Sequence, residues 1–171
     1  GTAHTLVYAN HISDCKHAVT HGGDPRYPAQ CRESRICGNI LIGATGATVD
    51  AHPICESVYV IGNTITGLNR PPTGPTGSAV WIGVKRGVVS GNIIYDGLVS
   101  FRPTIACDSF AVTDNHVFGE YASPFYTRSD TSTVDTLVIK GNVSHNTHMG
   151  IRLEILDIGH VVISGNTVQS A

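Results

Sequence analysis

An acidic and a basic side chain, Asp50 and His52, lie two residues apart in the segment from Val49 to Pro53. In a strand, residues two apart point to the same side, roughly 7 Å from one another. A carboxylate beside an imidazole can perform general acid and base catalysis, because histidine changes charge near neutral pH. The alternative is structural, with an Asp that holds a corner of the chain and a His that packs on Pro53.

Two aromatic rings and two guanidinium groups occur where later strands correspond to this segment. Trp81 and Tyr126 offer flat apolar faces with polar edges, which suit sugar rings. Arg102 and Arg128 offer planar donors that can hold carboxylate or sulfate groups. These four residues predict a binding surface for an acidic polysaccharide. The alternative is a solvated strand face whose Trp packs under a loop.

Four further residues are candidates for the same cluster: His17 and His21 as substrate-binding groups, and Asp24 and Glu56 as catalytic carboxyl groups. A glycoside hydrolase needs two carboxyl groups roughly 5 to 9.5 Å apart, which Asp50 with Asp24, with Glu56 or with a residue of a neighbouring chain would supply. A lyase needs a base and a cation, for which His52 and Arg102 are the candidates. The spacing of these residues matches no standard metal site, so we expect no metal and no cofactor.

A repeated segment determines how these residues are positioned. The pattern of Val161 to Val168 occurs about seven times, aligned on an asparagine at spacings of 23 to 29 residues. Glycine precedes the asparagine in five copies, Ala9 and Asp114 precede it in the other two, and a Val or Ile lies three residues before it in every copy. The asparagines of the repeat are Asn10, Asn39, Asn63, Asn92, Asn115, Asn142 and Asn166.

A unit of this length cannot bury its own apolar face, so the units must stack as a solenoid. Apolar residues alternate up to the Gly-Asn pair, which is typical of a strand that ends at a left-handed or tight corner. About 26 residues per turn fits three short strands and three corners. The sequence therefore predicts an all-β, right-handed parallel β-helix with about six to seven rungs and three strands per rung, in which the asparagines stack as a ladder.

The third strand of each rung carries the candidate site. Placing Val19, Val49, Val80, Val99, Phe125 and Ile151 inward predicts an outward column of Thr20, Asp50, Trp81, Ser100, Tyr126 and Arg152. We expect the segments 21–35, 67–77 and 129–135 to be loops, and the later third strands to span 79–84, 98–102, 124–128 and 150–155. Glu154 lies about four rungs from Asp50, roughly 19 Å away, which excludes it as a partner.

Two segments resemble right-handed parallel β-helix proteins of the pectate-lyase-like superfamily, and phage tailspikes and related depolymerases in particular. They are 17–23, His-Ala-Val-Thr-His-Gly-Gly, and 49–63, which contains Asp50-Ala51-His52 and ends in Gly-Asn. The resemblance implies a homotrimer at an extracellular or virion location. The segment 80–83, Val-Trp-Ile-Gly, lacks the Asp and His of the pectate lyase motif Trp-Ile-Asp-His, so calcium-dependent pectate cleavage is not implied.

Composition excludes several other classes of protein. The chain has 171 residues, 14% charged residues and a net charge of -2, which disfavours a nucleic-acid partner. No apolar run has the length of a membrane span, and no signal peptide is visible. We expect one domain over residues 1–171, and we expect it to be a piece of a longer chain because neither end carries a capping helix.

The five cysteines do not form pairs with metal-ligand spacing: Cys15, Cys31, Cys37, Cys55 and Cys107. A bridge from Cys31 to Cys37 and buried free thiols are both compatible with the sequence, and we predict no disulfide framework. The expected function is binding, with cleavage by a hydrolase or a lyase, of an acidic surface or capsular polysaccharide. The alternative is a non-catalytic adhesin or a structural fibre segment.

Overall fold

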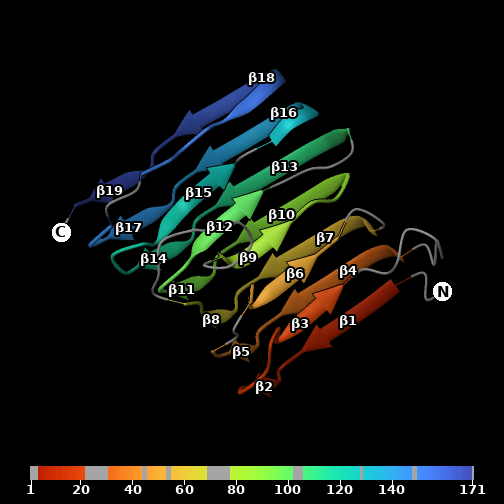
Figure 1. The fold of residues 1–171 in the computed structure, drawn as a ribbon, viewed down its shortest axis with the longest axis vertical. Helices are drawn as coiled ribbons and strands as arrows, with labels where there is room; N and C mark the ends of the chain where they lie inside the picture. Colours follow the sequence, from red (N-terminus) through yellow and green to blue (C-terminus); the bar gives the residue numbers. More distant parts are fainter. Residues whose placement is uncertain are drawn as a thin grey trace.

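The protein is described by a computed structural model that covers residues 4–21, 31–43, 46–52, 55–68, 78–101, 106–127, 129–147 and 150–170. Within these ranges all regular secondary structure is β-strand, and the strands form three parallel sheets (Figure 1). The first sheet contains β1 (His4–Tyr8), β4 (Cys31–Cys37), β7 (Cys55–Ile61), β10 (Arg86–Ser90), β13 (Cys107–Thr113), β16 (Ser129–Lys140) and β18 (Ile155–Ser164).

The second sheet contains the short strands that follow each asparagine, and the third contains the strands of the candidate site. The strands of the second sheet are β2 (His11–Ile12), β5 (Ile40–Leu41), β8 (Thr64–Thr66), β11 (Ile93–Tyr95), β14 (His116–Phe118), β17 (Val143–His145) and β19 (Thr167–Gln169). The strands of the third sheet are β3 (Val19–His21), β6 (Val49–Ala51), β9 (Ser78–Ile82), β12 (Leu98–Phe101) and β15 (Ser123–Thr127).

Each strand pairs with its counterpart one repeat away, which confirms the predicted parallel solenoid with three strands per rung. In Figure 1 the rungs rise in sequence order from β1 to β18. The first and second sheets have seven strands each and the third has five, so complete rungs are somewhat fewer than predicted. The difference arises near the last rung, where the expected strand 150–155 contributes only an isolated bridge between Tyr126 and Arg152 before β18 begins.

The corner between the first and second sheets is left-handed at every repeat, as the Gly-Asn pattern predicts. The residue before each asparagine has φ between +55° and +67°. A side chain is disfavoured there because its Cβ approaches the backbone, which explains why five of the seven residues are glycine. Ala9 and Asp114 adopt the same conformation at φ +55° and +57°.

The asparagines form the predicted ladder along this corner. The Oδ1 atom of Asn115 accepts bonds from the backbone N–H of Asn92 at 3.0 Å and from its Nδ2 at 2.9 Å. The same Nδ2 also donates to the carbonyl oxygens of Val60 and Ser90. Because the pattern recurs from Asn10 to Asn166, the side chains satisfy backbone groups that the turn of the chain leaves without a strand partner.

The space between the three sheets is filled by the inward side chains of all of them. The β-branched residue three positions before each asparagine, such as Ile36, Val89 or Val112, is fully buried in the interior rungs. Phe110 stacks on Phe101 with ring centroids 4.1 Å apart, and the ring lies directly over Gly87. A Cβ on Gly87 would be 2.4 Å from that ring, so glycine is required by close packing at this position.

Two predicted loops are wrong in part. Residues 129–135 belong to β16, because an irregularity in the pairing between Ser129 and Thr133 accommodates the extra polar residues within the strand. In the predicted loop 21–35, β4 already begins at Cys31, while residues 22–30 lie outside the described ranges. Of the predicted loop 67–77, only Gly67 and Leu68 are described.

The cysteines behave as thiols where the structure describes them. Cys15, Cys37 and Cys107 are free, so the bridge between Cys31 and Cys37 is not formed. Burial raises the pKa of Cys107 to about 12, and its Sγ donates to the carbonyl oxygen of Lys85. This thiol therefore stays protonated and serves as a packing residue.

Candidate functional site

The third sheet places the predicted outward residues in one row, in the predicted register. Asp50 of β6 pairs with Thr20 on one side and with Trp81 on the other. The row continues through Ser100 and Tyr126 to the bridge at Arg152. The pattern of apolar residues was sufficient to fix this register, because a shift by one residue would expose Val49 and Val80, both fully buried.

Asp50 and His52 contact one another directly. Nε2 of His52 lies 3.2 Å from Oδ2 of Asp50, within hydrogen-bond distance. The two side chains meet because they leave the same strand end on the same side, as the two-residue spacing predicts. When Asp50 is ionised it accepts this bond, so Nε2 carries the proton and Nδ1 of the neutral ring is left as the free base.

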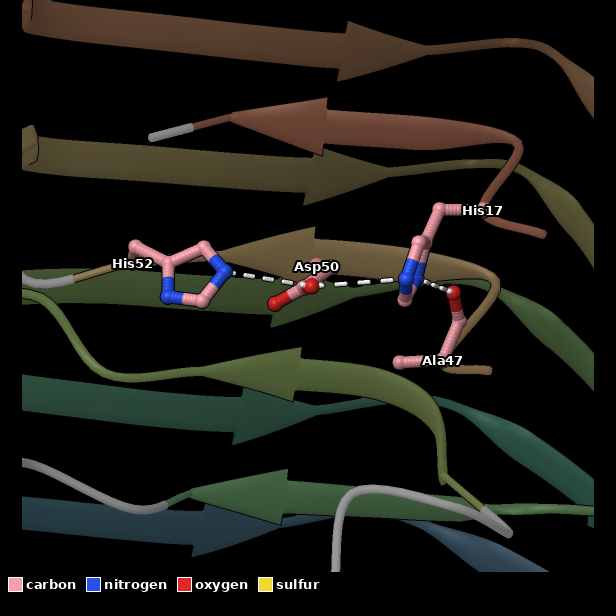
Figure 2. Close-up of polar contacts among 4 residues, drawn as sticks. All are labelled: His17, Ala47, Asp50 and His52. Atoms are coloured by element: carbon pink, nitrogen blue, oxygen red, sulfur yellow. Dashed lines mark hydrogen bonds and ion pairs between the residues drawn. The ribbon is translucent and has the colours of Figure 1, made fainter. Parts of the chain in front are cut away.

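A second imidazole lies on the opposite side of the carboxylate. His17, from the turn before β3, reaches across the rung boundary so that its Nδ1 lies 3.7 Å from Oδ2 of Asp50 (Figure 2). The same nitrogen donates to the carbonyl oxygen of Ala47 at 2.7 Å. Asp50 is therefore held between His17 and His52, and the predicted grouping of these three residues is observed; we call them the His-Asp-His cluster.

A glycine makes room for His17. A Cβ on Gly46 would lie 2.5 Å from Cε1 of the His17 ring, and the backbone N–H of Gly46 donates to the carbonyl oxygen of Lys16. The backbone of Ala18 and Val19 also donates to the carbonyl oxygen of Thr48. These contacts fix the turn that carries His17 against the rung that carries Asp50.

Trp81 supports His52 from the next rung. The two rings meet edge to face, with centroids 5.3 Å apart and an interplanar angle of 84°. The side chain of His52 is 40% exposed, whereas Trp81 is half-buried. The indole therefore restricts the orientation of the imidazole and remains partly available to a ligand.

Asp50 is the buried member of the cluster, although the sequence predicted an outward position. The residue is only 5% exposed, as is Ser100 farther along the row. Burial raises the pKa of Asp50 above its ordinary value, while the positive charges of His52, His17 and Lys16 and the hydrogen bond from His52 lower it in part. Its Oδ1 atom is buried and has no hydrogen-bond partner among the described residues.

The cluster can transfer a proton through His52. Asp50 is too buried to meet a polymer directly, whereas His52 presents its second ring nitrogen on the side away from Asp50 (Figure 2). A buried carboxylate that holds an exposed imidazole fixes its tautomer and stabilises its protonated form. The arrangement is therefore suited to a histidine base oriented by an aspartate.

The remaining candidate site residues lie elsewhere on the solenoid or outside the described ranges. Glu56 lies on β7 of the first sheet, where its carboxylate is 3.8 Å from the guanidinium of Arg86. Tyr126 is half-buried two strands beyond Trp81, and the guanidinium of Arg152 lies 5.6 Å from its ring centroid. Asp24, Arg102 and Arg128 lie outside the described residues, and of His21 only the backbone at the end of β3 is described.

Two contributions to the site were missed in the sequence. Lys16 is exposed, and its positive charge lowers the pKa of Asp50. The carbonyl oxygen of Ala47 fixes the ring of His17. The sequence did signal Lys16, because it directly precedes the candidate His17. The carbonyl oxygen of Ala47 belongs to the backbone, so no pattern of side chains could have predicted its role.

The described part of the chain offers neither a metal-binding cluster nor a membrane-spanning helix. In those ranges no three or more His, Cys, Asp and Glu side chains gather in a way that suits a metal ion. The same ranges contain no helix of the length and apolar character needed to cross a membrane.

The fold and the site together define a parallel β-solenoid with a His-Asp-His cluster on one face. Comparison of the chain with protein-family models, with curated proteins and with solved structures finds no match in any of the three.

Proposed function

We propose that the outer face of the third sheet binds an acidic polysaccharide and that His52 acts as the base in its cleavage by elimination. The observation that carries the proposal is the exposed imidazole of His52, hydrogen-bonded to the buried carboxylate of Asp50 and packed against Trp81. The carboxylate of Asp50 is buried and one of its oxygens has no hydrogen-bond partner in the part of the chain that the structure describes, which costs folding free energy. An Asp-His pair with a purely structural role would not need this arrangement, whereas functional sites often contain it.

The face suits a chain-like ligand because its rungs repeat at roughly 4.8 Å. Trp81 offers part of an indole beside the base, and Tyr126 lies two strands farther along the same row. A sugar ring packed on the indole would place its neighbours along the row, near Ser100 and Tyr126. We therefore propose that the polymer lies across the strands, along the solenoid axis.

In the elimination, His52 Nδ1 takes the proton from the carbon next to the uronate carboxylate. The electrons of that C–H bond form a carbon–carbon double bond, and the bond to the glycosidic oxygen of the next sugar breaks. The leaving oxygen takes a proton from water or from the His52 imidazolium. We assign to Lys16, whose charge lowers the pKa of Asp50, the stabilisation of the charge that develops on the uronate carboxylate.

Hydrolysis is the less favoured chemistry for this cluster. The groups that lower the pKa of Asp50 are His52, His17 and Lys16, and the carboxylate of Glu56 faces Arg86 on another sheet. A hydrolase would need a second carboxyl group beside Asp50. Asp24 is the remaining candidate from the sequence, and it lies outside the described residues.

A non-catalytic binding protein is the second candidate, because the contacts that hold His52 in place would serve it equally well. If His52 only binds a sugar hydroxyl, the same contacts hold it in place and no proton is transferred. In either case we propose a tailspike-like protein, homotrimeric and extracellular or on a virion. The rung repeat and the Asp-x-His segment support this proposal.

Depolymerisation assays separate the two candidates. The purified protein is incubated with a panel of uronate-containing capsular polysaccharides, and viscosity and reducing ends are followed. We expect cleavage by the native protein and by His160→Ala, which removes an exposed histidine of the first sheet, and none by His52→Ala. Retained binding with unchanged polymer across the panel would favour the binding protein.

A further inference from the structure

The outer face of the second sheet contains no Lys, Arg, Asp or Glu. Its strands are short, and β8, β11, β14 and β17 bury their middle residue, so two outward columns run along the sheet. The first column contains His11, Ile40, Thr64, Ile93, His116, Val143 and Thr167, and the second contains Thr66, Tyr95, Phe118, His145 and Gln169. We call these residues the uncharged face.

This composition is unusual for a surface exposed to water. With about 25 to 35% charged residues, an ordinary surface of this size would carry about three or four charges. The first sheet has an ordinary distribution, with Glu33, Arg35, Arg86, Asp108 and Lys140 on strands of the same rungs. The absence of charge is therefore a property of one side of the solenoid.

Large apolar side chains are exposed on the uncharged face. Ile40, Ile93 and Tyr95 are 46%, 42% and 41% exposed. Ile42 follows directly after β5, and Ile61 lies just across the asparagine corner, and both are similarly exposed. These apolar side chains alternate with uncharged polar ones along the column, and leaving them in water forfeits the free energy of their burial.

The aromatic rings of this face are not arranged to bind sugars. Tyr95 stacks on Phe118 with centroids 5.4 Å apart, and Phe118 stacks on His145 at 5.2 Å. Both flat faces of Phe118, and one face each of Tyr95 and His145, are thus covered by a neighbouring ring. The partner of this face is accordingly a surface with apolar side chains rather than a polysaccharide.

We propose that the uncharged faces of neighbouring copies of this chain bind one another. Two uncharged faces meet without leaving a charge buried and unpaired, whereas a charged partner would lose hydration without compensation. The ridges of side chains along this face repeat at roughly 4.8 Å, and a second copy carries ridges of the same spacing, which can interdigitate along the whole solenoid. This contact lies on a different sheet from the His-Asp-His cluster; it rests on the proposed homotrimer for the number of copies and not on the proposed chemistry.

Placing one charge on the face tests the contact. Thr64 is half-buried in the middle of the first column, so Thr64→Lys adds a charge and removes little apolar area. Thr136→Lys is the matched control, since Thr136 is half-buried on β16 of the first sheet. Thr167→Lys, at an exposed position of the same column, serves as a second variant if Thr64→Lys unfolds. Circular dichroism verifies that each variant is folded.

Sedimentation velocity over a concentration series gives the mass of each protein. We expect native protein and Thr136→Lys to sediment as oligomers, and Thr64→Lys and Thr167→Lys to have a dissociation constant raised at least about tenfold. Native protein that is monomeric throughout the series would overturn the proposal. Equal weakening by Thr64→Lys and Thr136→Lys would also overturn it, because the copies would then associate through another face.

Discussion

Nε2 of His52 lies 3.2 Å from Oδ2 of Asp50, and the two residues belong to opposite environments: His52 is 40% exposed and Asp50 is 5% exposed. The buried group can therefore orient the exposed one without meeting the ligand itself. This division of roles leads to the first two predictions.

Asp50→Asn should lower turnover by about 10²- to 10⁴-fold and leave polymer affinity nearly unchanged. An amide in place of the carboxylate does not fix the imidazole in the tautomer with a free Nδ1, and it does not stabilise the imidazolium. Initial rates and a separate binding isotherm on the same polysaccharide measure the two effects. If affinity falls as much as turnover, Asp50 contributes to ligand binding instead.

Asp50→Asn should also stabilise the protein at neutral pH. Burial raises the pKa of Asp50 above the ordinary value of 3.8, so the folded protein binds more protons than the unfolded chain between the two values. This carboxyl therefore stabilises the fold below about pH 3.8, and that contribution is lost as the pH rises through the folded pKa.

Calorimetry at several pH values measures this difference. We expect Asp50→Asn to unfold at a higher temperature than native protein at pH 7, with the difference narrowing as the pH falls toward the ordinary Asp value. Asp157→Asn, at an exposed position on β18, is the control and should change little. A lower unfolding temperature for Asp50→Asn at pH 7 would mean that the contact with His52 outweighs the cost of burial.

Asn92→Ala should cost about 2 to 5 kcal/mol of unfolding free energy. The substitution removes the acceptor of two bonds from Asn63 and the donor to Val60 and Ser90, all in the buried corner. Asn10→Ala, at the exposed end of the ladder, should cost about 1 kcal/mol or less. Urea unfolding compares the two variants, and equal losses would contradict a cooperative ladder.

Gly87→Ala should destabilise the core by about 1 to 3 kcal/mol through overpacking. The new Cβ would lie 2.4 Å from Cδ2 of Phe110, whose ring is already stacked on Phe101. The double variant Gly87→Ala, Phe110→Leu should recover part of the loss, because a smaller side chain relieves the contact. A thermal melt in which the single variant matches the native protein would show that the stack can shift freely.

The sequence was sufficient to predict the architecture because the same pattern of residues recurs in every repeat. A left-handed residue, an asparagine and an inward Val or Ile recur in fixed positions, so the register of Asp50 beside Trp81 follows from the buried column. Irregular segments carry no such redundancy. For this reason the strand through Ser129 to Asp135 was mistaken for a loop, and the strand expected at 150–155 is only a bridge.

The grouping of His17, Asp50 and His52 could be predicted, but the environment of each could not. An outward position on a strand indicates exposure, whereas Asp50 is buried beside two flanking imidazoles. The roles of Ala47 and Gly46 arise from a backbone carbonyl and from a missing Cβ. Such contacts depend on how consecutive rungs fit together, which the residue types alone do not encode.

The central claim is a base-catalysed elimination at His52. It is tested most directly by ultraviolet absorbance while the protein is incubated with a uronate-containing polysaccharide that the native protein cleaves. We predict that native protein and His160→Ala produce the absorbance of an unsaturated uronate in step with new chain ends, and that His52→Ala produces none. New reducing ends without that absorbance, or equal absorbance from His52→Ala, would contradict the account.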